Sequence, residues 1–123
     1  MDALCILVVD DHEVNLLLAE CVLEADGMEV LRAGDAESAR VALRARQPDL
    51  ILLDIQLPGV DGLSLAREFK ADARLAGVPV IAFTAHAMRG DEARFCAAGF
   101  DGYLAKPIEV TRFARQVRDF VAS

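Results

Sequence analysis

Charged and hydroxyl side chains follow directly on four apolar segments of this 123-residue chain. These residues are Asp10 and Asp11 after LCILVV, Asp54 after DLILL, Thr84 after VPVIAF, and Lys106 after GYLA. Three carboxylates within several ångströms of one another repel unless a cation joins them. Oxygen ligands completed by water are the donors that Mg²⁺ takes. We therefore expect a Mg²⁺ site, and no His or Cys ends these segments to favour zinc instead.

A carboxylate beside such a cation can act as a nucleophile. Asp54 could attack phosphorus and form an aspartyl phosphate, with Lys106 supplying countercharge and Thr84 a hydrogen bond. Each residue taken alone has a simpler interpretation: Asp10 and Asp11 as a helix cap, Asp54 in a turn, Thr84 in a strand, Lys106 on the surface. Their joint placement at successive segment ends is what those interpretations explain poorly.

Five apolar segments predict five strands, at residues 4–9, 28–33, 49–54, 78–83 and 102–105. Segments 4–9, 49–53 and 78–83 are almost continuously apolar, which is typical of strands buried on both faces of a parallel sheet. Right-handed crossovers place all carboxyl ends of such strands at one edge, where ligands bind. We predict an α/β three-layer sandwich that forms a single domain over residues 1–123.

Helical periodicity separates the predicted strands. The first helix is expected to bury the stripe Val14, Leu17, Leu18, Cys21 and Val22, and the last helix the stripe Val110, Phe113, Ala114, Val117 and Val121. Asp35 and Asp61 are expected to cap the second and third helices. Segment 87–98 is polar and contains Gly90, so we expect a short or loosely held helix there.

Composition narrows the functional classes. A net charge of −7 and a pI near 4.7 argue against nucleic acid or an anionic membrane as a direct partner, because phosphates attract clustered Lys and Arg. The three cysteines are far apart and form no CxxC pair, so neither a zinc site nor a disulfide framework is supported. No apolar run approaches the roughly 20 residues of a membrane span, and the first residues lack a basic signal region. We therefore expect a cytoplasmic protein.

Four motifs resemble the receiver domains of bacterial two-component response regulators. They are VVDD at 8–11, LLDIQLPGVDG at 52–62, FTA at 83–85 and AKP at 105–107, in the order and spacing of that family. VNLLL after the acidic pair, DIQLPGVDG, and TAHAMRGDEARFCAAGFDGYLAKPI are most similar to single-domain DivK-type regulators and to receivers of hybrid histidine kinases. The resemblance implies a flavodoxin/CheY-like fold whose five parallel strands lie in the order 2-1-3-4-5.

The resemblance also implies a role for each matching residue. Asp54 would accept a phosphoryl group from the phosphohistidine of a histidine kinase or a histidine phosphotransfer protein. Asp10, Asp11 and Asp54 would hold Mg²⁺, with the backbone carbonyl of Gln56 as a further ligand. Lys106 would pair with the phosphate.

Further positions of the family would control the response. Thr84 and Tyr103 would move together as a switch, and the side chains of Gln56 and His86 would tune hydrolysis of the phosphate. A cis peptide between Lys106 and Pro107 would direct the lysine into the site. His12, which follows the acidic pair, is interpreted as a side chain at the start of the first helix.

Such a protein would catalyse only its own phosphorylation and dephosphorylation, and it would signal to a downstream protein as a monomer or weak dimer. The start at Met1 favours a single-domain regulator. The alternatives are a receiver excised from a hybrid histidine kinase and an interaction domain that works without phosphate. A phosphatase with an aspartate nucleophile would need an acid–base carboxylate where Gln56 stands. A flavodoxin-like flavin binder would need a phosphate loop where the acidic DDHEVN stands.

Overall fold

The computed structural model describes residues 3–57, 59–84 and 91–122, with the backbone alone for residues 91 and 92. Five strands form one parallel sheet: β1 (Cys5–Val9), β2 (Glu29–Ala33), β3 (Leu50–Asp54), β6 (Val80–Thr84) and β7 (Gly102–Ala105). Their order across the sheet is β2-β1-β3-β6-β7. Numbered along the chain, this is the predicted order 2-1-3-4-5, and each strand is found within two residues of its expected bounds.

The register of the sheet brings the carboxyl ends of the strands to one edge. Val9 at the end of β1 lies opposite Leu53, and Asp54 at the end of β3 lies opposite Phe83. Strands β1, β3 and β6 are buried along their whole length, as their continuous apolar sequences predicted, whereas the edge strand β2 is partly exposed. The polar residues that end these strands are therefore held by a rigid apolar framework.

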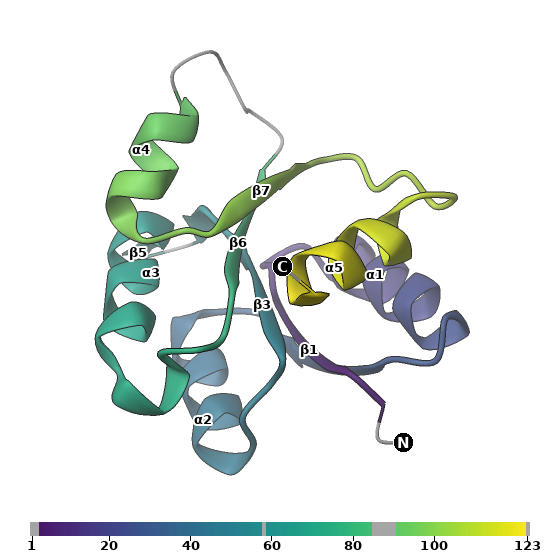
Figure 1. Cartoon of the computed structure of the whole chain (residues 1–123), viewed down its shortest axis with the longest axis horizontal. Helices are drawn as coiled ribbons and strands as arrows, with labels where there is room; N and C mark the ends of the chain where they lie inside the picture. Colours follow the sequence, from purple (N-terminus) through teal and green to yellow (C-terminus); the bar gives the residue numbers. More distant parts are fainter. Residues whose placement is uncertain (1–2, 58, 85–90, 123) are drawn as a thin grey trace.

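Helices cover both faces of the sheet (Figure 1). α1 (Glu13–Ala25) and α5 (Phe113–Ala122) pack on one face, while α2 (Ala36–Ala45), α3 (Gly62–Ala71) and α4 (Asp91–Ala98) pack on the other. A 3-10 turn, η1 (Ala73–Leu75), follows α3. The three layers confirm the predicted α/β sandwich.

The predicted helix caps are present. Asp35 accepts the N–H of Ser38 at 2.7 Å, and Asp61 accepts the N–H of Leu63 at 3.0 Å, so each satisfies one donor of a first turn. The expected short helix in segment 87–98 is α4, which has eight residues. Residues 87–90 of that segment lie outside the described residues.

The apolar stripe that we expected the first helix to bury was wrong. α1 buries Leu16, Ala19 and Leu23, whereas Val14 is 76% exposed and Leu17 is 53% exposed. The reason is that α1 carries apolar residues on opposite sides, so two stripes fit the helical period and only packing on β1 selects one. We call the exposed residues Val14 and Leu17 the α1 apolar patch.

Val110, expected in the stripe of the last helix, also lies elsewhere. It precedes α5, which begins at Phe113, and it is 59% exposed. The remainder of the prediction is confirmed at the two positions that α5 buries, Phe113 and Val117. This helix therefore starts later than the periodicity indicated, because Val110 continues the apolar pattern without packing on the sheet.

A two-stranded antiparallel ribbon, which the sequence did not predict, begins two residues after Asp54. It pairs β4 (Gln56–Leu57) with β5 (Val60–Asp61), and Gly59 between them has a φ of +74°. The ribbon brings the start of α3 against the chain after β3, where Gly62 N–H donates to the Ile55 carbonyl at 3.2 Å. A Cβ on Gly62 would lie 2.4 Å from Ile55 Cα. The close approach of α3 to the carboxyl edge thus requires glycine here.

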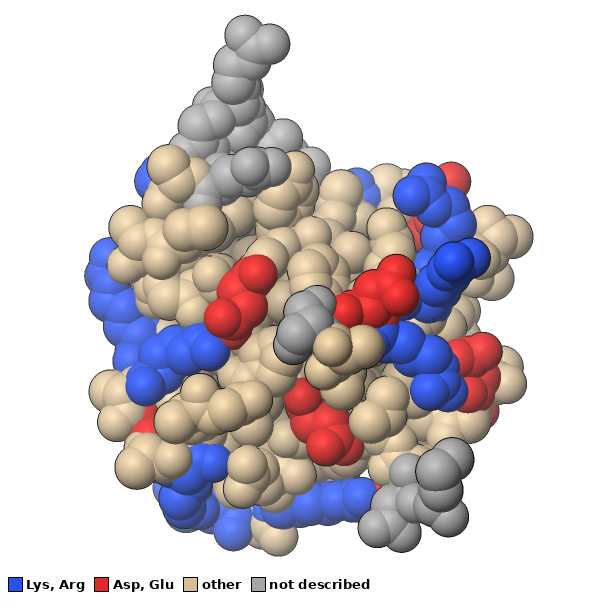
Figure 2. Space-filling view, in the orientation of Figure 1, with Lys and Arg blue, Asp and Glu red and all other residues tan. Residues whose placement is uncertain are grey.

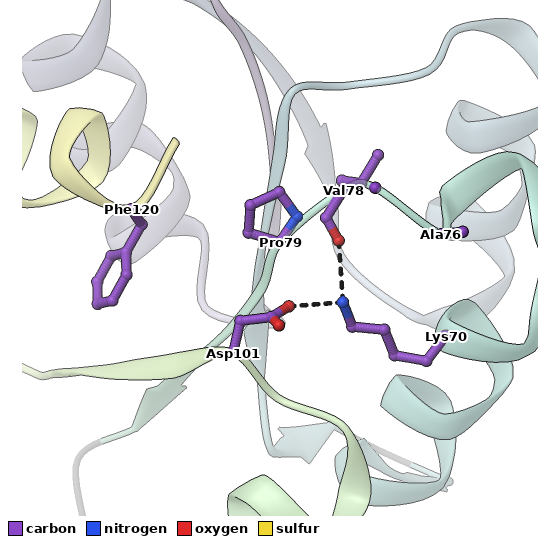
Figure 3. Close-up of a pocket in the computed structure, with 7 residues that line it drawn as sticks. Lys70, Ala76, Val78, Pro79, Asp101 and Phe120 are labelled. Carbon is purple, nitrogen blue, oxygen red and sulfur yellow. Dashed lines mark hydrogen bonds and ion pairs between the residues drawn. The ribbon is translucent and has the colours of Figure 1, made fainter. Parts of the chain in front are cut away.

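At the amino edge of the sheet, charged side chains are paired with one another. Lys70 on α3 lies 2.6 Å from Asp101 and donates to the Val78 carbonyl at 3.2 Å (Figure 3). Asp101 also accepts the N–H of Val80 at 2.8 Å. These groups line a cavity of about 380 Å³. Every charged group named here has a partner of opposite charge.

Positive side chains are spread over the surface. In Figure 2, Lys and Arg lie mostly around the outline of the molecule, with Asp and Glu between them. Some are paired, such as Arg40 with Glu68 at 2.8 Å. A mixed pattern of this kind is typical of a solvated surface. None of the helices in the described part of the chain has the length and apolar character needed to cross a bilayer.

Candidate functional site: an acidic cluster at the carboxyl edge of the sheet

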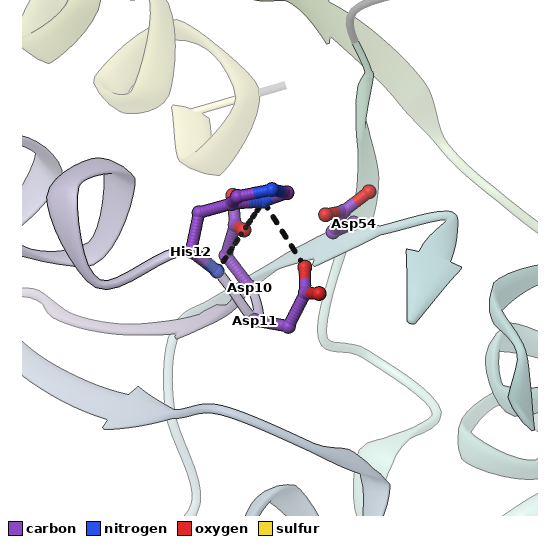
Figure 4. A group of neighbouring side chains, drawn as sticks. All are labelled: Asp10, Asp11, His12 and Asp54. Atoms are coloured by element: carbon purple, nitrogen blue, oxygen red, sulfur yellow. Dashed lines mark hydrogen bonds and ion pairs between the residues drawn. The ribbon is translucent and has the colours of Figure 1, made fainter. Parts of the chain in front are cut away.

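Three carboxylates and one imidazole meet where β1 and β3 end. One ligand atom from each of Asp10, Asp11, His12 and Asp54 lies within 4.8 Å of the others (Figure 4). Asp10 directly follows β1 and Asp54 is the last residue of β3, and these strands are neighbours in the sheet. The sheet topology therefore brings together the carboxylates that the sequence singled out.

Two of these carboxylates are buried. Asp10 is 0% exposed and Asp54 is 3% exposed, and burying a charge is costly unless it is paired. Lys106 supplies the pairing: its Nζ lies 2.8 Å from Asp10 Oδ2 and 3.1 Å from Asp54 Oδ2. The lysine is itself nearly buried, and its Nζ lies 4.9 Å from the centre of the Phe83 ring. One ammonium thus bridges two buried carboxylates.

Backbone donors fix the other oxygens of the same two side chains. The N–H of Gln56 donates to Asp54 Oδ1 at 2.9 Å, and the N–H of His12 donates to Asp10 Oδ1 at 2.9 Å. Hydrogen bonds from rigid backbone to a carboxylate hold its orientation as well as its charge. In this structure Asp10 therefore binds its own loop and does not cap α1.

The two buried carboxyls differ in acidity. Burial raises the pKa of Asp54 above its ordinary value, although the Gln56 N–H and the Lys106 ammonium act in the opposite direction. Burial would also raise the pKa of Asp10, but Lys106 and the His12 N–H outweigh it, and the pKa of Asp10 is lowered. The charged form is therefore favoured at Asp10 and disfavoured at Asp54.

The donor set fits a hard divalent cation. Asp10, Asp11 and Asp54 carry three negative charges, and Lys106 supplies one positive charge against them. Asp11 is partly exposed, which leaves the cluster open to solvent on that side. Oxygen donors at this spacing, with room for water, suit Mg²⁺. The excess of carboxylates over cations is what a bound divalent ion would neutralise.

Comparison with known proteins agrees with this geometry. Residues 6–118 match the family model described as the response regulator receiver domain. The chain belongs to this family. The receiver is 41% identical over 116 residues to the polar-differentiation response regulator DivK of Brucella anthropi, with 94% of each chain covered.

Solved structures show the same fold. A putative response regulator from Chloroflexus aurantiacus superposes with a TM-score of 0.91 at 30% identity, covering 99% of this receiver and 100% of that chain. The receiver domain of a sensor histidine kinase from Pseudomonas aeruginosa, described with a magnesium ion coordinated in its active-site cleft, superposes with a TM-score of 0.87 at 34% identity. That match covers 99% of this receiver and 100% of that domain. The resemblance stated from the motifs, including the CheY-like fold, is confirmed.

The remaining predicted site residues of the receiver fall into two groups. Thr84 ends β6 beside the cluster and is buried, and its carbonyl accepts the N–H of Lys106 at 2.8 Å. The peptide bond between Lys106 and Pro107 is cis. The Gln56 side chain is exposed next to Asp54, whereas His86 lies outside the described residues. The backbone carbonyl of Gln56 stays a predicted cation ligand.

Tyr103 lies away from the acidic cluster. It is half-buried in β7, and its ring centre is 6.2 Å from that of Phe95 on α4. Both rings line an apolar cavity of about 250 Å³ together with Cys96, Phe100, Gly102 and Phe120. Tyr103 therefore connects the sheet to the surface formed by α4, β7 and α5.

His12 is a residue of the site that the sequence did not single out. Nδ1 of His12 lies 3.1 Å from Asp11 Oδ1 and 3.3 Å from Asp10 Oδ1. The expectation of a side chain at the helix start is correct for the backbone, since His12 is the N-cap of α1. Its direct succession to the acidic pair was the signal that could have placed the ring in the cluster.

Proposed function

We propose that this receiver accepts a phosphoryl group on Asp54 from a phosphohistidine, with Mg²⁺ in the acidic cluster. The observation that carries the proposal is the buried Asp54 carboxylate, with one oxygen held by the Gln56 N–H and the other by Lys106. A carboxylate oxygen would bond to phosphorus as the bond from phosphorus to the donor's imidazole nitrogen breaks. The electron pair of that bond stays on the nitrogen.

The cluster residues have separate tasks in this reaction. Asp10, Asp11 and Asp54 would hold the cation, with the carbonyl of Gln56 as a further ligand. Bound Mg²⁺ supplies positive charge against the oxygens of the transferred group. Lys106 adds a second positive charge from the carboxyl end of β7 and would follow the phosphoryl oxygens after transfer. In this proposal, the protein catalyses only its own phosphorylation and dephosphorylation.

Phosphorylation would change the surface through Thr84 and Tyr103. An aspartyl phosphate brings new acceptor oxygens and extra negative charge to the end of β3. The hydroxyl of Thr84 would turn toward them, and Tyr103 would move with it, altering the apolar cavity beside Phe95. A downstream protein that binds the altered surface more tightly would shift the population toward it. The side chains of Gln56 and His86 would tune the lifetime of the phosphate.

The α1 apolar patch supports a helical phosphodonor as the partner. Val14 and Leu17 lie on the helix that starts three residues after Asp10, and both are largely exposed. Exposed apolar residues beside a reactive site are typical of a docking surface. A histidine kinase or a histidine phosphotransfer protein would dock there and present its phosphohistidine to Asp54. We expect this to occur in the cytoplasm, with the receiver a monomer or weak dimer that binds neither nucleic acid nor membrane.

Intact mass after incubation with acetyl phosphate and Mg²⁺ tests the proposal. We expect one phosphoryl adduct on the wild type, none on Asp54→Asn, and none when EDTA removes the cation. Asp101→Asn is the matched control, because it changes an aspartate at the amino edge, and we expect it to keep the adduct. No adduct on the wild type with either acetyl phosphate or a phosphohistidine donor would refute phosphotransfer and favour phosphate-independent binding.

Leu17→Asp tests the docking surface separately. We expect transfer from a phosphohistidine protein to slow about tenfold, the effect of losing roughly 1.4 kcal/mol at an interface, with no change in the reaction with acetyl phosphate. Val41→Asp is the control, since Val41 is 52% exposed on the opposite face of the sheet. Equal slowing by both variants would show that the patch is not the docking surface.

A further inference from the structure

His12 occupies the N-cap of α1, but its side chain does not cap the helix. N-cap residues are usually Ser, Thr, Asp or Asn, whose oxygen accepts an N–H of the first turn. The backbone N–H of His12 instead donates to Asp10, and the imidazole lies beside the aspartates, as Figure 4 shows. The ring therefore belongs to the acidic cluster and not to the helix start.

The ring lies at hydrogen-bond distance from its aspartate neighbours, and this spacing also suits two ligands on one ion. Bonds of about 2.1 Å at octahedral or tetrahedral angles place adjacent ligand atoms roughly 3.0–3.4 Å apart. Nδ1 of His12 lies 3.1 Å from Asp11 Oδ1 and 3.3 Å from Asp10 Oδ1. Asp54 completes a set of three oxygens and one nitrogen within 4.8 Å of one another. A cation among these carboxylates would meet the imidazole already in place.

We propose that His12 is a nitrogen ligand of the cation held by the aspartates, and that it shifts the preference of the site from Mg²⁺ toward divalent transition ions. Carboxylate oxygens suit Mg²⁺, whereas imidazole suits borderline ions such as Fe²⁺, Ni²⁺ and Zn²⁺. The side chain of His12 is 67% exposed, so an ion from solvent can reach it. This inference rests on the cation site of the proposed function and does not require phosphorylation.

Binding of Co²⁺ and Mg²⁺ to the apoprotein, measured by calorimetry at one pH, tests the preference. We expect His12→Asn to weaken Co²⁺ binding about tenfold, the usual loss when a metal site is impaired, and to change Mg²⁺ binding less than about threefold. Asparagine is a favourable N-cap residue, so the variant should keep α1. Asp101→Asn changes a carboxylate at the amino edge of the sheet, outside the acidic cluster, and should behave as the wild type with both ions.

Proton NMR of the Co²⁺ complex shows coordination directly. Imidazole protons shifted far from their usual range by the paramagnetic ion should appear in the wild type and in Asp101→Asn, and should be absent from His12→Asn. Their absence from the wild type, or an equal loss of affinity for both ions, would overturn the inference and leave the ring as a hydrogen-bond partner of the carboxylates. A thiolate-to-cobalt absorption band would overturn it as well, because binding would then involve an exposed thiol such as Cys21.

These outcomes separate the inference from the proposed function. Shifted imidazole signals in a protein that forms no phosphoryl adduct would support His12 as a ligand and refute phosphotransfer. An adduct that forms with Mg²⁺ in a protein without shifted imidazole signals would support phosphotransfer and refute the ligand role.

Discussion

At the carboxyl edge of the sheet, Asp10 and Asp54 share the ammonium of Lys106. At the amino edge, Asp101 is the one described carboxylate paired with Lys70, and it also accepts the N–H of Val80. The residue types are the same and the sheet is the same. The carboxyl edge holds Asp10, Asp11 and Asp54 against one lysine, and two of these carboxylates are buried. The amino edge is balanced, and the side chains of Asp101 and Lys70 are partly exposed.

The difference shows that a cation site can be recognised by carboxylates that lack enough positive charge nearby. An aspartate with a cation and an N–H donor, such as Asp101, is satisfied and contributes to stability. An excess of carboxylates around one buried ammonium is a cost that the fold carries until a cation binds. Matched variants at the two edges can measure this difference in charge balance.

Replacing the lysine at each edge should give the largest effect. Lys106→Met leaves Asp10 and Asp54 facing each other without a countercharge, and removing one partner of a buried ion pair costs about 3 kcal/mol of unfolding free energy. Lys70→Met breaks a partly exposed pair and should cost about 1 kcal/mol or less. Urea denaturation in EDTA measures both.

Magnesium then separates the two lysine variants. Lys106→Met has one positive charge fewer in the cluster, so Mg²⁺ should raise its melting temperature more than that of the wild type. The shift for Lys70→Met should equal that of the wild type. Equal stability losses, or equal responses to Mg²⁺, would mean that the carboxyl edge is no more strained than the amino edge.

Adding a methyl group to a glycine at each edge should give an intermediate effect. Gly62→Ala places a Cβ 2.4 Å from Ile55 Cα, next to the end of β3, and overpacking against backbone costs about 2 kcal/mol. Gly77→Ala, near the amino edge, meets no atom within 4 Å. Its stability should stay within about 0.5 kcal/mol of the wild type or rise slightly. Thermal unfolding compares the two, and a tolerated Gly62→Ala would show that α3 can move away from Asp54.

The sequence was sufficient to predict the features that long apolar segments determine. Strands ending at Val9, Asp54 and Thr84 follow from buried runs, and parallel crossovers then place Asp10, Asp54 and Lys106 at one edge. The caps Asp35 and Asp61 were predicted because a single side-chain hydrogen bond defines them. These features depend on local chemistry or on topology alone.

Features that depend on packing between elements could not be predicted from the sequence. The buried face of α1 could not be chosen, because Leu16 and Leu17 lie on two stripes that are both apolar. The ribbon β4–β5 has only two residues in each strand, so it depends on the pairing of the strands and not on the strand propensity of their residues. The position of the His12 ring depends on contacts of its Nδ1 with Asp10 and Asp11, and the direct succession of His12 to the acidic pair was the one signal of them in the sequence.

Neutralising one carboxylate at each edge should give the smallest effect, with opposite signs. Because burial raises the pKa of Asp54, its environment disfavours the charged form. Without divalent ions at pH 7.5, Asp54→Asn should therefore raise the free energy of unfolding, by less than Gly62→Ala lowers it. Asp101→Asn removes the charge that pairs with Lys70 and should lower it by about 1 kcal/mol or less.

The pH dependence follows from the direction of the Asp54 shift. A raised pKa in the folded state means that protonated Asp54 stabilises the fold below the ordinary aspartate pKa, and that this stability is lost as the pH rises through the raised value. The advantage of Asp54→Asn should therefore disappear as the pH falls below the ordinary aspartate range. Saturating Mg²⁺ should reverse it at pH 7.5, because the wild type then gains a ligand that the variant lacks. If Asp54→Asn is less stable than the wild type in EDTA, Lys106 already compensates both buried carboxylates. The two edges would then differ in the ligands they can bind and not in unbalanced charge.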